Sequence, residues 1–366
     1  MKRIYFTVTN SIVYDQRMQR ICTSLANHGY SVCLIGRKVK NHPIPDKTTY
    51  RTILLNCIFA KSFLFYAEYN IRLFLYLFSQ KMDIVCAIDA DTLLPCLFYS
   101  KIKKVKRVYD AHEYFSEQKE IVIRKLIQWV WQLIEKWCIP QFKHGYTVNK
   151  ILQNTFQQKF GVQYNIIRNL PLLPANFPAN TTISDTKVIL YQGAVNHGRC
   201  FETLIPAMKQ VPAVLWIIGT GNFYEEAKTL IKAYGLEEKI QLVGAMLPEK
   251  LKTITPGAYF GLTLFEATGF NQTHSLANRF FDYIMAGIPQ ICVNYPAYAA
   301  IQQKYQVAYM VNTTDETTLA NAMNNLLNDT VLYQQLQQQC GIARKKLNWQ
   351  QEEIKLLSFW KNICIS

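Results

Sequence analysis

The stretch IYFTVTNSIVYDQRMQRICTSLANHGYSVCLIG, residues 4–36, predicts a strand, a helix and a second strand in succession. Residues 4–10 are apolar and rich in β-forming side chains, which is typical of a strand. A helical stripe follows, with apolar side chains at three- and four-residue spacing: Met18, Ile21, Cys22 and Leu25. Gly29 then ends the helix, because glycine is the usual residue just past a helix C-terminus. Residues 31–36 complete the unit as the next strand.

The same alternation continues along the chain. Apolar runs typical of strands recur at 83–89, 107–111, 145–149, 188–193, 213–219, 240–244, 259–265, 289–294 and 307–312. Helical or loop segments follow each of these runs. Continuous apolar strands that alternate with helices indicate parallel sheets covered on both faces.

The length of 366 residues favours two domains. The sequence therefore predicts an α/β chain with two Rossmann-like doubly wound domains that face each other across a ligand-binding cleft. We expect the N-terminal domain over 1–170, a linker rich in proline, asparagine and threonine over 171–186, and the C-terminal domain over 187–349. A final helix at about 350–366 is expected to pack back on the N-terminal domain.

The net charge of +15 is distributed unevenly. Residues 1–168 carry 25 Lys and Arg against 11 Asp and Glu, a balance of +14, whereas residues 169–366 carry 15 against 14, a balance of +1. This asymmetry indicates a polyanionic partner of the N-terminal half: a membrane surface, an anionic lipid headgroup or nucleic acid. Nucleic acid ranks last, because the sequence contains no RNA-binding signature.

The ten cysteines show no C-x-x-C spacing, so we interpret them as buried apolar residues of a reduced, cytoplasmic protein. We expect the N-terminal run to be a strand and not a signal peptide, and we expect no membrane span, because no segment of the given sequence has the required length and apolarity. Two stretches, 63–78 and 121–142, mix aromatic residues with a few charges. One interpretation is ordinary packing helices, and the other is helices that lie on a bilayer with cations at the headgroups.

Two turns of the C-terminal half are candidate phosphate sites. In YQGAVNHGRCFETL (191–204), Gly193 opens a turn and Arg199 stands at the start of a helix, where backbone amides and a guanidinium attract an anion. Gly219 and Gly221 repeat the pattern in GTGNFYEE (219–226). Neither turn is a Walker loop or a G-x-G-x-x-G motif, and most turns of this kind contain glycine, so a purely structural role stays open for both.

HSLANRFFDYIMAGIPQI, residues 274–291, is the block most suggestive of nucleotide binding. Asn278 and Arg279 open a helix, and Asp282 lies one turn from Arg279. Arg279 can pair with a phosphate, and Asp282 can accept hydrogen bonds from both hydroxyls of a ribose.

Asp110-Ala111-His112-Glu113 brings two carboxylates and a histidine together at the end of a predicted strand. A metal site would need a second cluster of ligands with suitable spacing, and the sequence offers none. A structural interpretation is also open, in which Asp110 and His112 finish a strand and hydrogen-bond the local backbone, and it suits Asp110 in particular. His112 and Glu113 are the candidate catalytic residues, because the carboxyl ends of parallel strands are where ligands bind.

In this order, the segments resemble the GT-B glycosyltransferases of the large retaining family four. The resemblance covers most of the chain and rests on YDQRMQRICTSLANHGYSV (14–32), VYDAHEYF (108–115), IIRNLP (166–171), LYQGAVNHGR (190–199), IIGTG (217–221) and ANRFFDYIMAGIPQI (277–291). It implies a nucleotide diphosphate sugar in the C-terminal domain and an acceptor in the N-terminal domain.

The resemblance also implies roles for single residues. Arg199 matches the cation that meets the pyrophosphate, Arg279 the basic residue before the ribose acid, and Asp282 that acid. His112 matches the histidine that reaches the donor sugar, and we expect Glu113 to orient it or to meet the acceptor. Three positions depart from the pattern: Ala194 replaces a common Arg, His274 replaces the first acid of a paired motif, and residues 10–13 replace a glycine-rich loop.

The expected activity is that of a hexosyltransferase of the retaining type. It moves a sugar from a UDP- or GDP-linked donor to a cell-envelope, capsule or other polysaccharide acceptor, lipid-linked acceptors included. No cofactor is expected, because cations and helix N-termini stabilise the departing diphosphate. The expected location is cytoplasmic, with peripheral attachment to the inner face of the cell membrane left open. Two alternatives remain: a nucleotide-sugar epimerase of the same fold, and a non-catalytic protein that binds a membrane surface.

Overall fold

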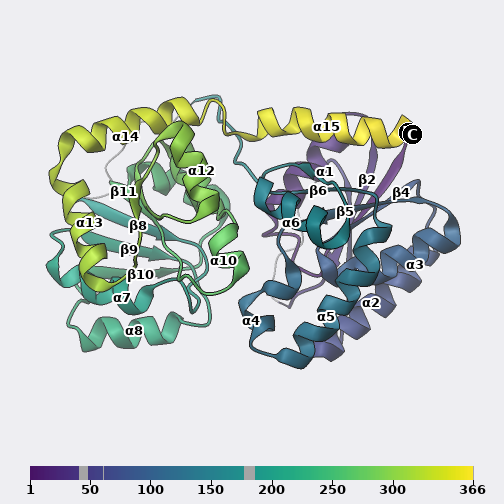
Figure 1. Cartoon of the computed structure of the whole chain (residues 1–366), viewed down its shortest axis with the longest axis horizontal. Coiled ribbons are helices and arrows are strands. Elements are labelled where there is room, and N and C mark those ends of the chain that lie inside the picture. The colour runs from purple at the N-terminus through teal and green to yellow at the C-terminus, as the bar shows by residue number, and fades with distance from the viewer. Residues whose placement is uncertain (41–47, 61, 177–185, 366) are drawn as a thin grey trace. The chain divides into compact units, whose positions relative to one another are not determined.

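The computed structural model describes residues 1–40, 48–60, 62–176 and 186–365 (Figure 1). The chain divides into two compact units. The first unit comprises Met1–Asn169 together with Glu352–Ser366, and the second comprises Leu170–Gln351. Of the linker expected at 171–186, residues 177–185 lie outside the described residues, and the neighbouring residues 171–176 form no helix or strand.

The first unit is built on a seven-stranded parallel sheet with the order β3-β2-β1-β4-β5-β6-β7. Its strands are β1 (Arg3–Thr7), β2 (Ser31–Arg37), β3 (Arg51–Leu55), β4 (Ile84–Ile88), β5 (Lys106–Ala111), β6 (His144–Thr147) and β7 (Asn165–Ile166). The strand order reverses direction at β1 and β4, which makes the carboxyl ends of these strands the place where such a sheet binds ligands.

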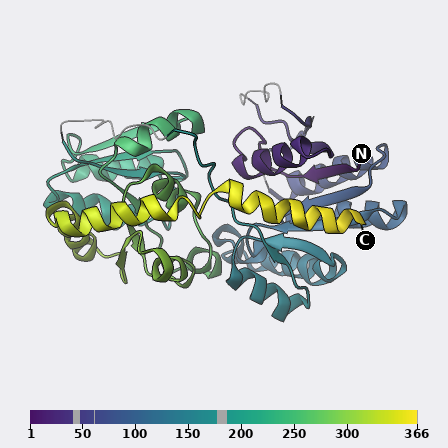
Figure 2. The same cartoon turned by 90° about the horizontal axis from the view of Figure 1, so that it is seen from above.

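Helices connect and cover these strands. They are α1 (Gln16–Asn27), α2 (Ser62–Phe78), α3 (Leu93–Lys103), α4 (Lys119–Val122), α5 (Lys125–Cys138), α6 (Lys150–Phe160) and α15 (Trp349–Ile365), with short 3-10 turns η1 (Ala90–Thr92), η2 (Phe115–Glu117) and η3 (Ile139–Gln141). In Figure 2, α15 lies along the strands of this unit. Its aromatic side chains make the contact: the Trp360 ring lies 5.4 Å from that of Phe6 on β1, and the Phe359 ring lies 5.0 Å from that of Tyr146 on β6.

Helix α1 shows why the sequence pattern predicts this unit. The four apolar side chains at helical spacing, Met18, Ile21, Cys22 and Leu25, are all buried. Asp15 caps the start of the helix by accepting a hydrogen bond from the Met18 amide at 3.0 Å, a contact that satisfies one of the open N–H groups of the first turn. After the helix, Gly29 takes φ +85°, a conformation that glycine adopts without steric cost.

The second unit repeats the plan with a six-stranded parallel sheet in the order β10-β9-β8-β11-β12-β13. Its strands are β8 (Val188–Gln192), β9 (Val214–Ile218), β10 (Ile240–Gly244), β11 (Phe260–Thr263), β12 (Gln290–Val293) and β13 (Tyr309–Val311). The order reverses at β8 and β11, so the carboxyl ends of these two strands mark the expected ligand position.

The helices of the second unit are α7 (Phe201–Ala207), α8 (Tyr224–Ala233), α9 (Pro248–Ile254), α10 (Phe270–His274), α11 (Asn278–Ala286), α12 (Pro296–Tyr305), α13 (Glu316–Asn328) and α14 (Thr330–Ala343), with 3-10 turns η4 (Met208–Gln210) and η5 (Thr255–Gly257). A large apolar core fills the space between the sheet and these helices. The two parallel sheets with their covering helices confirm the predicted fold class of two Rossmann-like α/β domains.

The sequence patterns missed two strands, β3 and β7, and both lie at an edge of the first sheet. Eight of the ten cysteines are buried, whereas Cys57 and Cys364 are only partly so. Within the described parts of the chain, no helix combines the length and the apolarity that crossing a membrane requires.

Candidate functional site

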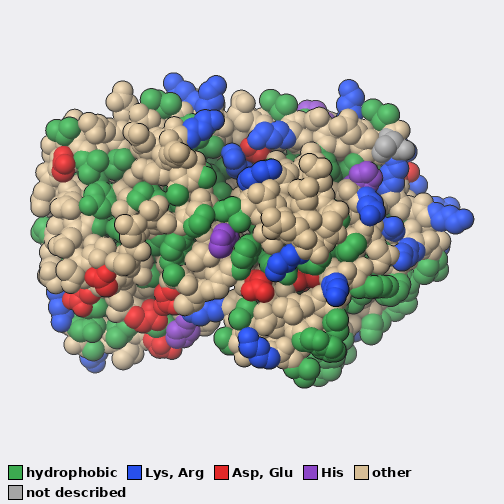
Figure 3. Space-filling view, viewed as in Figure 1, with side chains coloured by type: hydrophobic (Ala, Val, Ile, Leu, Met, Phe, Trp, Pro, Cys, Tyr) green, Lys and Arg blue, Asp and Glu red, His purple; other side chains and the backbone are tan. Residues whose placement is uncertain are grey.

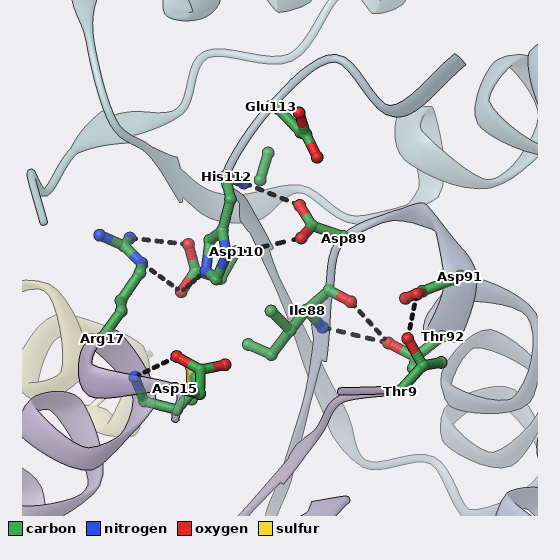
Figure 4. A network of polar contacts seen from close by, with 12 residues as sticks. Thr9, Asp15, Arg17, Ile88, Asp89, Asp91, Thr92, Asp110, His112 and Glu113 are labelled. Carbon is green, nitrogen blue, oxygen red and sulfur yellow. Dashed lines mark hydrogen bonds and ion pairs between the residues drawn. The ribbon is translucent and has the colours of Figure 1, made fainter. Parts of the chain in front are cut away.

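His112 lies directly after β5, at the carboxyl edge of the first sheet (Figure 4). Its imidazole lies between two carboxylates. Nε2 lies 3.1 Å from Oδ2 of Asp110, and Nδ1 lies 3.5 Å from Oδ2 of Asp89. The His112 backbone amide also donates to Oδ1 of Asp89 at 2.9 Å. Both ring nitrogens are therefore turned toward acids of the same unit.

Asp110 in turn is bound to Arg17, which extends from the first turns of α1. The guanidinium donates through Nη2 to Oδ1 at 2.8 Å and through Nε to Oδ2 at 3.2 Å, and its Nη1 donates to the Ile167 carbonyl at 2.9 Å. Both side chains are buried. The structural interpretation of Asp110 as a partner of the local backbone was wrong, since its carboxylate pairs with a side chain 93 residues away.

Arg17, Asp110, His112 and Asp89 form a row of charged side chains, and their contacts with one another set their charge states. Burial alone would lower the pKa of His112, but Asp110 and Asp89 outweigh it and raise that pKa to about 9. Burial alone would raise the pKa of Asp110, but Arg17 and His112 outweigh it and hold that pKa below its usual value. At neutral pH, His112 is thus an imidazolium between acids.

Asp89 comes from the turn that follows β4, and this turn also supplies a further acid, Asp91. Asp89 combines φ +54° with ψ 176°, a conformation that is rare for residues other than glycine and is often found at functional sites. Burial, and next the charge of Asp89, raise the pKa of Asp91 to about 8, and its carboxylate accepts a hydrogen bond from the Thr9 hydroxyl. The sequence interpretation missed both acids, although IDADT (88–92) places them directly after an apolar strand.

Glu113 lies apart from this row and points away from His112 in Figure 4. Its carboxylate accepts a hydrogen bond from the Gln118 amide. Burial, and next the charge of Asp89, raise its pKa to about 7. The contacts that orient the imidazole belong to Asp89 and Asp110, so the orienting role expected for Glu113 falls to those two residues.

Over the part of the chain that the structure describes, no group of three or more His, Cys, Asp or Glu side chains is placed to hold a metal ion.

In the second unit, the predicted glycines shape the loops after β8 and β9. The Gly193 amide donates to the Ile218 carbonyl at 2.9 Å, and the Gly219 amide donates to the Gly244 carbonyl at 2.8 Å. A Cβ on Gly219 would lie only 1.8 Å from the Gly193 oxygen, and a Cβ on Gly221 would lie 2.3 Å from the Val195 oxygen. Both of these glycines are therefore required by the close approach of two backbone segments.

Arg279 is the most unusual group of the second unit. The residue is only 7% exposed, and its guanidinium donates to the Tyr191 hydroxyl at 3.0 Å and to the Leu264 carbonyl at 3.1 Å. Its central carbon lies 4.5 Å from the ring centres of both Tyr191 and Phe265. Among the described residues, no carboxylate lies within ion-pair distance of this buried cation.

The Arg279 guanidinium also lies directly behind the first glycine turn, since a Cβ on Gly193 would be 3.2 Å from Nη1. Arg199 joins it, because the Arg199 guanidinium carbon lies 4.3 Å from the centre of the same Phe265 ring. Arg199 stands in the loop before α7, whose first residue is Phe201. The structure thus brings the two predicted cations together at the carboxyl ends of β8 and β11.

Asp282 and Asn278 lie on α11, the helix that begins at this edge. The Asp282 carboxylate is half-buried and accepts a hydrogen bond from the Gln192 side chain at 3.1 Å, at the last residue of β8. Asn278 is exposed in the first turn. His274, where the family pattern has an acid, ends α10, and its ring stacks on Phe270 at 4.4 Å. All predicted residues of the second unit therefore belong to segments that border the switch point of its sheet.

Comparisons with known proteins agree with this fold. Residues 174–346 match the family model described as glycosyl transferases group 1. Sucrose-phosphate synthase of Thermosynechococcus elongatus superposes with a TM-score of 0.80 at 15% identity, covering 100% of each chain. These findings support a GT-B glycosyltransferase.

Two further structures are similar over nearly the whole chain. HepE of Anabaena, in complex with UDP-glucose, has a TM-score of 0.76 at 12% identity, covering 99% of this chain and 100% of its own. WaaG, a glycosyltransferase involved in lipopolysaccharide biosynthesis, has a TM-score of 0.74 at 13% identity, covering 96% of this chain and 98% of its own. No curated protein matches the sequence.

Proposed function

We propose that this glycosyltransferase belongs to the retaining family four and transfers a hexose from a nucleotide diphosphate sugar to a glycan of the cell envelope or capsule or to another polysaccharide. The observation that carries the proposal is the buried Arg279 guanidinium, which has no carboxylate in ion-pair range among the described residues. An uncompensated buried cation is costly unless an anion neutralises it. A diphosphate at the β8–β11 switch point supplies that anion.

The donor site that we propose uses the residues around this point. Arg279 and Arg199 contact the diphosphate, since a guanidinium matches phosphate oxygens in geometry and charge. The turn at Gly193, and the loops packed by Gly219 and Gly221, leave backbone close to the phosphates. Asn278 lies in the first turn of α11, whose N-terminal amides favour negative charge. Asp282 accepts hydrogen bonds from the ribose hydroxyls.

The first unit, in this proposal, binds the acceptor and supplies His112 to a hydroxyl of the donor sugar. Nδ1 is the ring nitrogen that we propose to contact this hydroxyl, because its 3.5 Å distance to Asp89 is longer than an ordinary hydrogen bond. The opposite edge faces Asp110, whose Oδ2 lies 3.1 Å from Nε2. Glu113, whose pKa of about 7 lets it exchange a proton near neutral pH, is proposed to meet the acceptor.

The chemistry follows from these placements. The bond between the anomeric carbon and the diphosphate oxygen breaks through an oxocarbenium-like state. The acceptor oxygen bonds to the same face of the sugar, and its proton passes to the departing phosphate. Arg279 and Arg199 stabilise the charge that develops on the leaving group, and the loss of one such contact is worth about 2.7–4 kcal/mol in comparable sites.

The donor class is supported by HepE of Anabaena, whose structure contains UDP-glucose. We propose a UDP- or GDP-linked sugar as donor and no separate cofactor. Acceptors include lipid-linked glycans, which would place the protein in the cytoplasm or on the inner face of the cell membrane. The excess of cations in the first half of the chain supports an anionic membrane surface as a partner.

A donor screen tests the proposal. The purified protein is incubated with UDP- and GDP-sugars, with and without glycan and lipid-linked acceptors, and the released nucleotide is measured. We expect acceptor-dependent release with retention of the anomeric configuration, and its loss in Arg279→Ala. An isomerised sugar formed from the donor alone would favour an epimerase. The absence of release together with the absence of thermal stabilisation by any nucleotide diphosphate would refute the proposal.

A further inference from the structure

Three helices of the first unit expose apolar side chains on their outer side. We call this surface the apolar face, and Figure 3 shows green side chains gathered over α2 and α5. It comprises Phe63, Leu64, Ile71, Leu75 and Phe78 of α2, Phe98 and Ile102 of α3, and Ile123, Leu126, Trp129, Leu133 and Trp137 of and before α5. Apolar patches of this extent are uncommon on monomeric proteins and mark interaction surfaces.

Helix α5 shows the pattern most clearly. The side chains that pack inward are Trp131, Glu135 and Cys138. The stripe on the other side, at helical spacing, is also apolar: Leu126, Trp129, Leu133 and Trp137. Leu126 is 75% exposed, Trp129 is 56% exposed and Trp137 is 48% exposed. A surface helix ordinarily turns polar residues outward, so the outer side of α5 lacks a covering partner in the described chain.

Helix α2 repeats this arrangement. Its inward stripe is Phe65, Tyr69, Leu73 and Leu77. Its outward side carries Leu64, Ile71, Leu75 and Phe78, all exposed. Because i and i+7 lie on the same side of a helix, these residues form a continuous strip along α2.

The strips of α2 and α5 are joined through α3. The Phe98 ring of α3 lies 5.7 Å from the Trp137 ring of α5. Lys103 of α3 lies with its Nζ 4.0 Å from the ring centre of Phe78 on α2. The exposed residues therefore form one surface that extends over three helices.

The charges around this surface are mostly positive. The exposed charged residues of α2, α3, α5 and the positions next to them are Arg72, Lys101, Lys103, Lys104, Arg124, Lys125 and Lys136, and Glu120 of α4 is an exposed acid nearby. Glu68 of α2 binds the backbone amides of Ile58 and Phe59 at 2.9 Å and pairs with Arg72, and Glu135 of α5 is buried. The apolar face thus presents aromatic and aliphatic side chains together with an excess of positive charge.

We propose that the apolar face docks on an anionic lipid bilayer and lies in its interface without crossing it. Helices that lie on membranes combine such an apolar side with Lys and Arg, whose stems follow the apolar surface while their charges reach the headgroups. Lys101 shows this posture, with Nζ 5.6 Å from the Trp137 ring centre. Tryptophan is itself enriched at the boundary between lipid and water.

A second copy of the chain fits this surface less well. In a two-fold dimer the same patch contacts itself, so the lysines of one copy would face those of the other. An anionic bilayer instead neutralises these cations. The purpose of this docking, access to a lipid-linked acceptor, rests on the proposed function. The binding to the bilayer requires neither donor nor acceptor.

Vesicle flotation with the full chain tests the inference. The vesicles are either neutral phosphatidylcholine or phosphatidylcholine mixed with phosphatidylglycerol, across a salt series. We expect the protein to float with the anionic vesicles and to be released by high salt, since salt screens surface charges. The variant Trp129→Ser/Trp137→Ser should lower the bound fraction at least tenfold, and Lys125→Glu/Lys136→Glu should remove the dependence on phosphatidylglycerol.

Val331→Ser/Ile354→Ser is the matched control, because both residues are exposed and apolar but lie outside the apolar face; it should float like the unmodified protein. The absence of flotation, or equal flotation of the tryptophan variant and the control, would overturn the inference. Self-association that is lost in the tryptophan variant would overturn it in favour of a dimer. Thermal stabilisation of every variant by UDP or GDP is measured in parallel, so that a failure of the proposed function is recognised separately.

Discussion

The two units each bury an arginine near the switch point of their sheet, and the surroundings of these two residues differ. Arg17 is paired with the carboxylate of Asp110 through two hydrogen bonds, and Asp110 also faces His112. Arg279 meets a phenol hydroxyl, a backbone carbonyl and two aromatic rings, all of them neutral. The first cation is neutralised within its own unit, whereas the second has no carboxylate of the described chain in ion-pair range.

The two sites also differ in what holds them together. In the first unit, ion pairs between side chains fix His112. In the second unit, contacts between backbone segments fix the site, because the loops after β8 and β9 approach so closely that only glycine fits at position 219. We infer that side-chain charges fix the first site and that closely packed backbone fixes the second, which in the proposed function binds the diphosphate.

The largest expected effect comes from breaking the neutralised pair. Asp110→Asn keeps the shape of the side chain but leaves Arg17 as an unpaired buried charge, which should lower the free energy of unfolding by about 3–5 kcal/mol. Chemical denaturation measures this. The control is Asp83→Asn, which removes one partner of the exposed Arg3–Asp83 pair and should cost about 0–1 kcal/mol. Equal losses in the two variants would contradict the account of the first site.

A smaller effect is expected from the frame of the second site. Gly219→Ala places a Cβ against the Gly193 oxygen and demands a φ near +151° from alanine. Strain of this kind costs about 1–3 kcal/mol and should also weaken the thermal stabilisation by nucleotide diphosphates. Gly341→Ala is a suitable control, since a Cβ there would meet no atom within 4 Å. Unchanged stability of Gly219→Ala would show that the two loops separate freely.

The free energy of unfolding should depend on pH through the charged groups of the first site. His112 has a folded pKa of about 9, above its ordinary value of 6.5. The stabilisation from its protonated form is fully present below pH 6.5 and is lost as the pH rises toward 9, with a total of roughly 1–3 kcal/mol. Unfolding measured at several pH values in this window should show the decline, and His112→Gln should flatten it. Asp91 has a pKa raised to about 8, so the free energy of unfolding also falls as the pH rises toward 8. His112→Gln should therefore remove the part of the decline that comes from His112 and leave the part that comes from Asp91.

The smallest effect is expected at Arg279, and it is the counterpart of the first prediction. Arg279→Met leaves no carboxylate without its partner, because none lies in ion-pair range in the described chain. The Tyr191 hydroxyl keeps its own hydrogen bond to the Ala194 carbonyl at 2.7 Å. The free energy of unfolding without ligand should therefore change by about 1 kcal/mol or less. A loss as large as that of Asp110→Asn would mean that Arg279 serves the fold.

The sequence predicted the fold class because strand runs and helical spacing are local patterns. The missed strands show the limit of that approach: β7 has two residues, and β3 is a short run at the edge of its sheet. Edge strands need only a single neighbour, so their sequence signal is weak.

The candidate sites were partly predictable. Spacing and resemblance pointed to His112 and Arg279, and the structure places both at the carboxyl ends of strands. The pairing of Arg17 with Asp110 joins residues 93 positions apart, so it follows only from the fold. The same holds for the lack of a carboxylate within ion-pair range of Arg279 in the described chain, which depends on how α11 packs against β8 and β11. Asp89 and Asp91 did leave a signal, a pair of acids at the end of an apolar run.

The central claim is that Arg279 is reserved for a diphosphate, and calorimetric titration with UDP and GDP tests it most directly. The unmodified protein should bind at least one of them, and Arg279→Met should bind it roughly 10- to 150-fold more weakly, as expected for a charge-assisted hydrogen bond of about 1.5–3 kcal/mol. Arg72→Met, which removes an exposed arginine already paired with Glu68, should leave the affinity unchanged. An affinity that Arg279→Met does not alter, or equal weakening in both variants, would contradict the account.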